Sequence, residues 1–298
     1  MATLPLGDDD VRFYREQGYL VVEGVVDEEQ LDLIRCEVDA AVAGAGKVVE
    51  NDDVYDLEAS HTPERPRVRR IKTPHLHIAS LGRLARSAPL VSVLKRLIGP
   101  GVRLQTSKLN MKSAGYGAAV EWHQDWAFYP HTNEDLLAVG VMLDDMTDEN
   151  GPLLVMPGSH KGPVYDHHHD GYFCGAIDLD QCDLDFSRAV ALTGPAGSMS
   201  FHHVRMVHGS AVNRSDHQRR LMLYQYTSTD AWPLIETVDD IESYDTMIVA
   251  GEPTLEPRVT AVPVRLPLPP APYQGSIYEN QRTIGQRYFD LEKGVGGD

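Results

Sequence analysis

The sequence is poor in the residues that mark disulfide-bonded, metal–thiolate and membrane proteins. Its 298 residues include only three cysteines, Cys36, Cys174 and Cys182. These are too few and too scattered for a disulfide framework or a zinc–thiolate site. No stretch approaches the roughly 18 uninterrupted apolar residues that a membrane-spanning helix needs. The first ten residues also lack the basic stretch and apolar core of a secretory signal peptide. We therefore expect a soluble, cytoplasmic protein.

Positive charge is scarce as well. Lys and Arg number 27 against 44 Asp and Glu, which gives a formal net charge of −17. Proteins that bind phosphate backbones or anionic membranes usually carry the opposite sign, so neither nucleic acid nor a membrane is the expected main partner. The hydrophobic share of 42% and charged share of 24% are those of an ordinary globular protein. We expect a small-molecule substrate, and no pattern in the composition indicates an oligomeric state.

The hydrophobic spacing changes near residue 100. Before it, apolar residues recur at helical spacing in 11–17, 27–41 and 87–98, with a β-rich run at 19–26. Beyond it, short β-rich runs lie between Gly, Pro, Asp and Asn, without long helices between them: 102–111, 136–143, 153–156, 199–207 and 220–226. This pattern favours a mainly β sandwich or double-sheet barrel over a doubly wound α/β sheet. We predict one domain, with helical decoration over 8–100, a β core over about 101–230 and a wrapping C-terminal segment over 231–298.

The strongest local signal is the sequence Glu121-Trp-His-Gln-Asp125. Because side chains alternate along a strand, His123 and Asp125 would face the same side and could bind one metal ion. A hydrogen-bonded core histidine is the alternative interpretation. A second His-x-Asp sequence, His168-His-Asp170, lies in a segment rich in Gly and Asp, and we interpret it as a solvated loop. The aromatic residues after the first sequence could wall a dry pocket: Trp126, Phe128 and Tyr129.

A metal site of this kind needs a third ligand, and residues 197–210 offer His202, His203 and His208. His208 differs from the other two through its downstream neighbours Gly209, Ser210 and, eleven positions on, Arg219. Two histidines and one carboxylate on a β scaffold form the facial triad of non-heme Fe(II) oxygenases, whose open positions take O₂ and commonly 2-oxoglutarate. The far carboxylate of 2-oxoglutarate needs a cation, ideally a guanidinium, beside a hydroxyl such as Ser210. Arg219 and Arg220 would face opposite ways on a strand, so only one of them can serve.

Four blocks of the sequence together resemble the phytanoyl-CoA dioxygenase family of Fe(II)/2-oxoglutarate oxygenases. They occur in the family's order within a resemblance that runs from about residue 10 to 230: Trp122-His-Gln-Asp125, Asp145-Met-Thr-Asp-Glu-Asn-Gly151, Pro157-Gly-Ser-His-Lys-Gly162, and His208-Gly-Ser-Ala-Val-Asn213 with Arg219. The resemblance implies a double-stranded β-helix (jelly-roll, cupin-like) core. It implies iron at His123, Asp125 and His208. It also implies Arg219, rather than Arg220, at the 2-oxoglutarate tail, and further cosubstrate positions at Lys72 and Lys108.

The activity implied by the resemblance is oxidative. Fe(II) activates O₂, 2-oxoglutarate gives succinate and CO₂, and a C–H bond of a small molecule is hydroxylated. Related halogenases have a small residue where this chain has Asp125, which favours an oxygenase outcome over halogenation. Two alternatives remain open: a non-catalytic jelly-roll protein that binds a ligand or metal, and a metal-dependent hydrolase that uses the same three residues to activate water.

One position departs from the family pattern. Members often have a tryptophan on the strand before the Asp-Glu-Asn-Gly turn, where this chain reads Val139-Gly-Val-Met142. Gly140 is therefore predicted to open space beside the cosubstrate. We interpret His160 as a structural residue.

Overall fold

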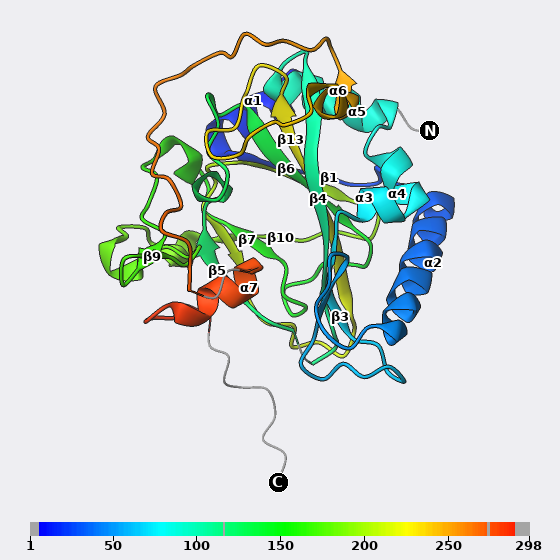
Figure 1. Cartoon of the computed structure of the whole chain (residues 1–298). Helices are drawn as coiled ribbons and strands as arrows, with labels where there is room; N and C mark the ends of the chain where they lie inside the picture. The colour runs from blue at the N-terminus through cyan, green and yellow to red at the C-terminus, as the bar shows by residue number, and fades with distance from the viewer. Residues whose placement is uncertain (1–5, 116, 273–274, 290–298) are drawn as a thin grey trace.

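Two antiparallel β-sheets face each other in the computed structural model, which describes residues 6–115, 117–272 and 275–289 (Figure 1). Two parts of the predicted wrapping segment, 273–274 and 290–298, lie outside this description. The larger sheet has the strand order β1 (Tyr19–Val22), β11 (Met199–His203), β6 (Leu136–Met142), β13 (Arg219–Ser228), β4 (Val102–Lys112), β3 (Val68–Lys72) and β2 (Tyr55–Leu57), and β14 (Ile248–Ala250) also pairs with β4.

The smaller sheet has the order β10 (Val190–Leu192), β7 (Leu153–Val155), β12 (His208–Ser210) and β5 (Val120–His123). Apart from β2, β3 and β4, neighbouring strands of the two sheets are far apart in sequence: β13 lies between β4 and β6, and β12 lies between β5 and β7. The two sheets therefore form the double-stranded β-helix rather than a series of hairpins. The expected jelly-roll fold is confirmed. A separate short hairpin joins β8 (His168–His169) to β9 (Tyr172–Phe173). The segment interpreted as a solvated loop therefore contains a small piece of regular structure.

Helices cover the outer face of the larger sheet. They are α1 (Asp8–Gln17), α2 (Glu28–Gly44), α3 (Pro74–His77), α4 (Ala79–Leu84) and α5 (Ala88–Ile98). Asp27 sets the start of α2, because its carboxylate accepts a hydrogen bond from the Gln30 amide at 2.9 Å. The outward residues of β13 pack against these helices, and the hydroxyl of Tyr224 donates to the Leu81 carbonyl of α4 at 2.8 Å. None of the helices in the described part of the chain is long and apolar enough to cross a membrane.

The chain after β13 runs back over the barrel. It forms α6 (Ile241–Thr246) and β14, continues without regular structure past residue 251, and reaches α7 (Ile277–Asn280). The indole of Trp126 donates to the Pro263 carbonyl at 2.9 Å, and the Phe173 amide donates to the Pro269 carbonyl at 3.0 Å. Figure 1 shows α7 near β5 in the lower half of the view, whereas α6 lies at the top. The C-terminal segment thereby reaches the smaller sheet.

Candidate metal centre and cosubstrate pocket

His123 and His208 occupy directly opposed positions on β5 and β12. Opposed residues of an antiparallel pair project to the same face, so the two buried rings lie 4.0 Å apart, measured between centroids. Asp125 is not on the strand, because β5 ends at His123 and Asp125 begins a short 3-10 turn. Gln124 between them keeps an extended backbone, with φ −119° and ψ 128°. The two-residue alternation therefore still brings Asp125 to the side of His123.

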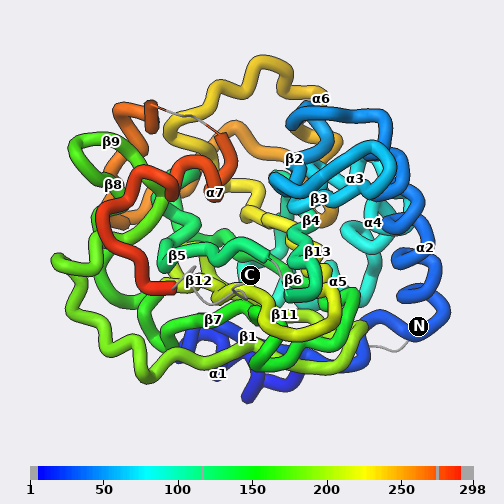
Figure 2. Tube along the Cα trace, turned by 90° about the horizontal axis from the view of Figure 1, so that it is seen from below, coloured from blue at the N-terminus to red at the C-terminus, as the bar shows by residue number. Residues whose placement is uncertain are grey.

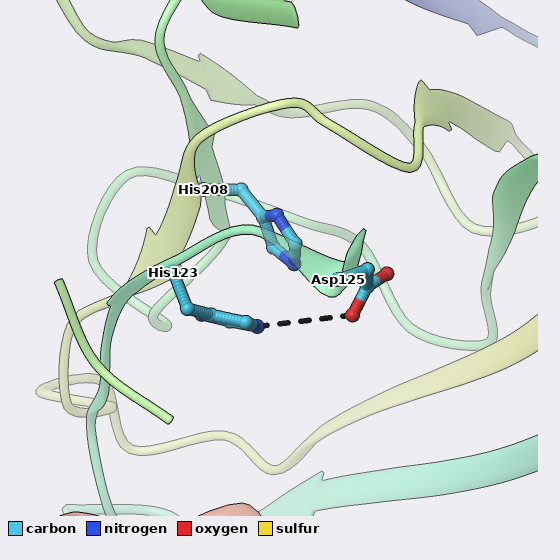
Figure 3. A group of neighbouring side chains, drawn as sticks. All are labelled: His123, Asp125 and His208. Carbon is cyan, nitrogen blue, oxygen red and sulfur yellow. Dashed lines mark ion pairs between the residues drawn. The ribbon is translucent and has the colours of Figure 1, made fainter. Parts of the chain in front are cut away.

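Each imidazole is held with one nitrogen left for a ligand. Nδ1 of His123 donates to the Glu121 carbonyl at 2.8 Å, and Nδ1 of His208 donates to the Met206 carbonyl at 2.9 Å. Such bonds fix the ring orientation of metal-binding histidines. One ligand atom from each of His123, Asp125 and His208 lies within 4.8 Å of the others, and Nε2 of His123 is 4.0 Å from Oδ1 of Asp125 (Figure 3). The donor set and its spacing suit one divalent cation.

His202 lies next to these three residues. Its Nε2 is 3.7 Å from Oδ2 of Asp125, and its ring centroid is 4.6 Å from that of His208. Neither of its ring nitrogens has a hydrogen-bond partner within the described residues. His203, the third histidine of the segment, turns the other way and accepts a hydrogen bond from the Arg205 amide at 3.1 Å. Of the three histidines, His208 completes the triad, and His202 lies next to the Asp125 carboxylate.

The protonation states of the triad are those that a metal ion requires. Burial lowers the pKa of His123 to about 4 and holds the pKa of His208 well below its ordinary value. Burial raises the pKa of Asp125, but His202, Lys108 and His208 together hold it well below its usual range. At neutral pH the site therefore presents two neutral imidazoles and an ionised carboxylate, and no ligand must lose a proton to bind a metal.

A cavity extends from the two histidines to Arg219 and Ser210. Arg219 is buried and its guanidinium donates to the Gly151 carbonyl at 2.6 Å, but no carboxylate of the described residues pairs with it. Burial lowers its pKa to about 10. A buried guanidinium without a counter-ion is costly, and an anionic ligand would remove that cost. The other residues that line this cavity come from both sheets and from α7, and they include Lys108, Asn110, Ile277 and Tyr278.

Lys112 lies beside the candidate cosubstrate residues, a position that was not predicted from the sequence. Its position on β4 is opposite Arg219 on β13, and its Nζ donates to Oγ of Ser210 at 2.8 Å and to the Ala211 carbonyl. Because Lys112 donates to Ser210, the Ser210 hydrogen is left to donate to a ligand in the cavity. Burial first, and then Arg219, lowers the pKa of Lys112 well below its usual value. Its spacing of two from Asn110 and four from Lys108 was the available signal, since all three share one face of β4.

Of the two lysines that the resemblance implied, only Lys108 lines the cavity. Lys72 lies on β3 with its Nζ 3.1 Å from the Asp56 carboxylate and 2.6 Å from the Asp52 carbonyl. Lys72 forms an ion pair with the buried Asp56 carboxylate and does not line the cavity, so the geometry does not place Lys72 at the cosubstrate. Arg70 also pairs with Asp56, and Arg69 pairs with Glu279. Three basic residues between positions 69 and 72 thus pair with two carboxylates of the protein itself.

Gly140 does not open space as predicted. A side chain at this position would meet Oγ of Ser200 at 2.6 Å and the Leu221 side chain at 3.2 Å, so neighbouring residues fill the volume.

Among the aromatic residues after the Glu121–Asp125 sequence, Phe128 packs edge-on against His123 at 5.7 Å between centroids. Trp126 instead belongs to a core cluster with Leu136. His160 lies outside the cavity lining, and its Nε2 contacts the Arg15 carbonyl at 3.2 Å.

The site consists of two imidazoles, one carboxylate and an adjoining cavity that ends at a guanidinium without a carboxylate partner among the described residues. These features define the site as that of a non-heme iron enzyme with a keto-acid cosubstrate. Comparisons with known proteins agree with this interpretation of the site. A sequence model of the phytanoyl-CoA dioxygenase (PhyH) family matches residues 14–221. A probable alpha-ketoglutarate-dependent hypophosphite dioxygenase of Stutzerimonas stutzeri is 39% identical over 282 residues, which cover 93% of this chain and 98% of the relative.

Two further proteins extend the comparison. The L-proline trans-4-hydroxylase of Streptomyces griseoviridis is 31% identical over 252 residues, covering 77% of this chain and 83% of that protein. The crystal structure of EctD from S. alaskensis with bound Fe superposes with a TM-score of 0.66 at 22% identity, over 85% of this chain and 87% of that one, and shares the fold. The chain therefore belongs to the phytanoyl-CoA dioxygenase family, and it is a 2-oxoglutarate-dependent non-heme iron dioxygenase.

Proposed function

We propose that His123, Asp125 and His208 hold Fe(II), and that Arg219 and Ser210 hold the distal carboxylate of 2-oxoglutarate. The convergence of the three ligand atoms within 4.8 Å is the observation that carries this proposal. When bound, Fe(II) and 2-oxoglutarate supply the oxidation, in which one atom of O₂ enters the substrate and the other enters succinate as CO₂ leaves. The protein's own residues would orient the cosubstrate: Arg219 and Ser210 would hold its far carboxylate, and the cavity runs from them to His123 and His208.

The substrate in this proposal is a small anion bound by Lys108. Lys108 lies four residues from Lys112 on the same face of β4, which is about 13 Å along a strand. It is therefore at the metal end of the cavity rather than at the end that takes the 2-oxoglutarate tail. Burial lowers the pKa of Lys108, Asp125 opposes this change and Arg70 adds to it. No carboxylate in the described ranges pairs with it, so its charge is available to a ligand.

The charges of the site favour an anion as well. Fe(II), Lys108 and Arg219 together carry more positive charge than Asp125 and the two carboxylates of 2-oxoglutarate neutralise. A surplus of positive charge then remains at the metal end, and in a site shielded from water such a surplus favours binding of a negative group. A neutral or purely apolar substrate would leave Lys108 in the cavity without a partner.

A phosphorus oxyanion with a P–H bond is the anion that we propose first, on the likeness to the Stutzerimonas stutzeri relative. Hypophosphite would become phosphite as its P–H bond is replaced by P–OH, while 2-oxoglutarate and O₂ give succinate and CO₂. Hydroxylation of a C–H bond, as expected from the resemblance, is the competing outcome.

Succinate release tests both parts of the proposal. Protein purified without oxygen is loaded with Fe(II), 2-oxoglutarate and ascorbate, and is then given hypophosphite, L-proline or ectoine in air. We expect hypophosphite to accelerate succinate formation, with phosphite appearing in the ³¹P spectrum in equal amount. Acceleration by L-proline or ectoine, with none by hypophosphite, would overturn the anionic substrate. No succinate under any condition would favour the non-catalytic or hydrolytic alternatives.

Lys108→Met separates the substrate from the cosubstrate. Loss of a charged hydrogen-bond donor costs about 1.5–3 kcal/mol, so we expect the KM for hypophosphite to rise at least tenfold while the KM for 2-oxoglutarate stays unchanged. Lys72→Met is the matched control, because Lys72 is opposite Lys108 on the neighbouring strand but is paired with Asp56. A larger effect of Lys108→Met on 2-oxoglutarate would assign Lys108 to the cosubstrate instead.

A further inference from the structure

The C-terminal segment supplies one wall of the cosubstrate cavity. Ile277 and Tyr278 of α7 line the same cavity as Arg219 and Ser210, although they come almost sixty residues after Arg219 in the chain. They also lie outside residues 14–221, to which the family model extends. Figure 2 shows this segment passing beside β5 and β12, the two strands that carry the metal-binding histidines.

Several contacts hold this segment in place. The Arg69 guanidinium pairs with Glu279 and lies over the Tyr278 ring, 4.5 Å from its centroid. The side chain of Gln281 accepts from the Glu121 amide at 3.0 Å and donates to the Gly175 carbonyl at 2.8 Å. Further along, the Glu121 carboxylate accepts from the amides of two later residues at 3.0 and 3.3 Å, namely Tyr288 and Phe289. Since Glu121 belongs to β5, the wall is fixed to the strand that carries His123.

The Tyr278 side chain is largely buried and lines the cavity that Arg219 also lines. The residue is 8% exposed, and no hydrogen bond joins its hydroxyl to another of the described residues. Arg219 and Tyr278 are close enough to influence each other's pKa: burial raises the pKa of Tyr278, and Arg219 opposes that rise more than any other group does. A phenol is a hydrogen-bond donor of the kind that a carboxylate accepts. Tyr278, Arg219 and Ser210 therefore each bring a side chain with a hydrogen-bond donor to the lining of the same cavity.

We propose that Tyr278 binds the distal carboxylate of 2-oxoglutarate together with Arg219 and Ser210, so that the C-terminal segment completes the cosubstrate pocket. This inference rests on the proposed function, in which Arg219 and Ser210 hold that carboxylate. The Arg69 guanidinium, stacked on the ring and paired with Glu279, positions the phenol rather than contacting the ligand. The chain beyond the jelly-roll strands is then part of the binding site.

Binding of two ligands tests the assignment. 2-Oxoglutarate has the distal carboxylate, whereas oxalate chelates a metal in a similar way and has no tail. We would measure the Kd of each by anaerobic titration calorimetry on the Fe(II)-loaded full chain, for the wild type and for Tyr278→Phe, Arg219→Ala and Tyr288→Phe. Tyr288→Phe is the matched control, because it removes a phenol from the same segment that does not line the cavity.

We expect Tyr278→Phe to weaken 2-oxoglutarate about tenfold, as for loss of one hydrogen bond to a charged group, and to leave oxalate unchanged. Arg219→Ala should weaken 2-oxoglutarate more, and Tyr288→Phe should change neither ligand. Unchanged 2-oxoglutarate binding in Tyr278→Phe, with a loss in Arg219→Ala, would overturn the role of Tyr278 alone. Unchanged binding in Arg219→Ala would overturn the proposed cosubstrate site itself. An equal loss for both ligands in Tyr278→Phe would mean damage to the fold and would also overturn the inference.

Discussion

The two faces of β13 differ in what its charged residues contact. Arg220, on the outer face, makes a two-pronged ion pair with Asp144, at 2.7 and 3.0 Å, and reaches Asp39 of α2 at 2.8 Å. Arg219, on the inner face, has only the Gly151 carbonyl at 2.6 Å and no carboxylate in the described part of the chain. Two adjacent arginines of one strand are thus buried in opposite electrostatic situations.

This contrast separates a stabilising residue from a binding residue. An ion pair that satisfies its own charge contributes to the stability of the folded chain, and a buried charge that is left unpaired needs an external partner. The rest of the strand shows the same division. Tyr224 and Tyr226 face outward into the helix-packed core, whereas Leu221 and Leu223 face the cavity. The inner face is therefore where substitutions should affect function, and the outer face is where they should affect stability.

Among residues that face the interior of the barrel, Asp125→Ala should have the largest effect on activity. Without the carboxylate, the two histidines alone hold the metal, so Fe(II) affinity should fall and succinate formation should drop to the level of the metal-free protein. Metal titration and succinate release measure the two effects. Asp170→Ala is the control, since Asp170 ends the second His-x-Asp sequence and its side chain is 87% exposed. Normal turnover in Asp125→Ala would contradict its assignment as a ligand.

The adjacent arginines should give opposite results. Arg220→Ala leaves Asp144 without its partner and should reduce the free energy of unfolding by about 3 kcal/mol, measured by denaturant titration. Arg219→Ala should raise the KM for 2-oxoglutarate roughly ten- to a hundredfold, with little loss of stability, because it removes a charge-assisted pair worth about 1.5–3 kcal/mol. If Arg220→Ala raised that KM while Arg219→Ala did not, the assignment of the two faces would be reversed.

The smallest effect is expected for Tyr224, which is buried between β13 and the helices. Tyr224→Phe removes the hydrogen bond to the Leu81 carbonyl and should lower stability by about 1 kcal/mol. The KM for 2-oxoglutarate should stay unchanged, because the ring points away from the cavity. A change in that KM without a change in stability would show that the two faces of β13 are coupled.

Much of the β core could be predicted because strands leave a local signal. The run over 102–111 became β4 and the run over 220–226 became the centre of β13, since both alternate or remain apolar along their length. The run over 199–207 was predicted as one strand but divides after His203. The chain beyond it joins the other sheet as β12, where His208 meets His123. A break between two sheets depends on long-range pairing and leaves no periodicity in the sequence.

The candidate site could likewise be predicted only in part. The His-x-Asp spacing and the residues after His208 marked the triad, and the expected metal-binding side chains lie together. Lys112 and Tyr278 were not recognised, because each resembles an ordinary strand or tail residue until its neighbours are known. His202 was considered only as a third ligand, and its place beside the Asp125 carboxylate was not foreseen. Lys72 was expected at the cosubstrate, but the buried Asp56 beside it holds its charge.

By itself, the sequence determined the β character of the core, the three candidate metal ligands and the alternation that separates Arg219 from Arg220. These properties arise from the chemistry and spacing of residues that are close in the chain. Only the tertiary structure decided which buried charges find a partner and which of them face the cavity, because those outcomes depend on strands and segments separated by tens to hundreds of residues. Tyr278 enters the pocket for that reason: the path of the C-terminal segment, rather than any local pattern, brings it to Arg219.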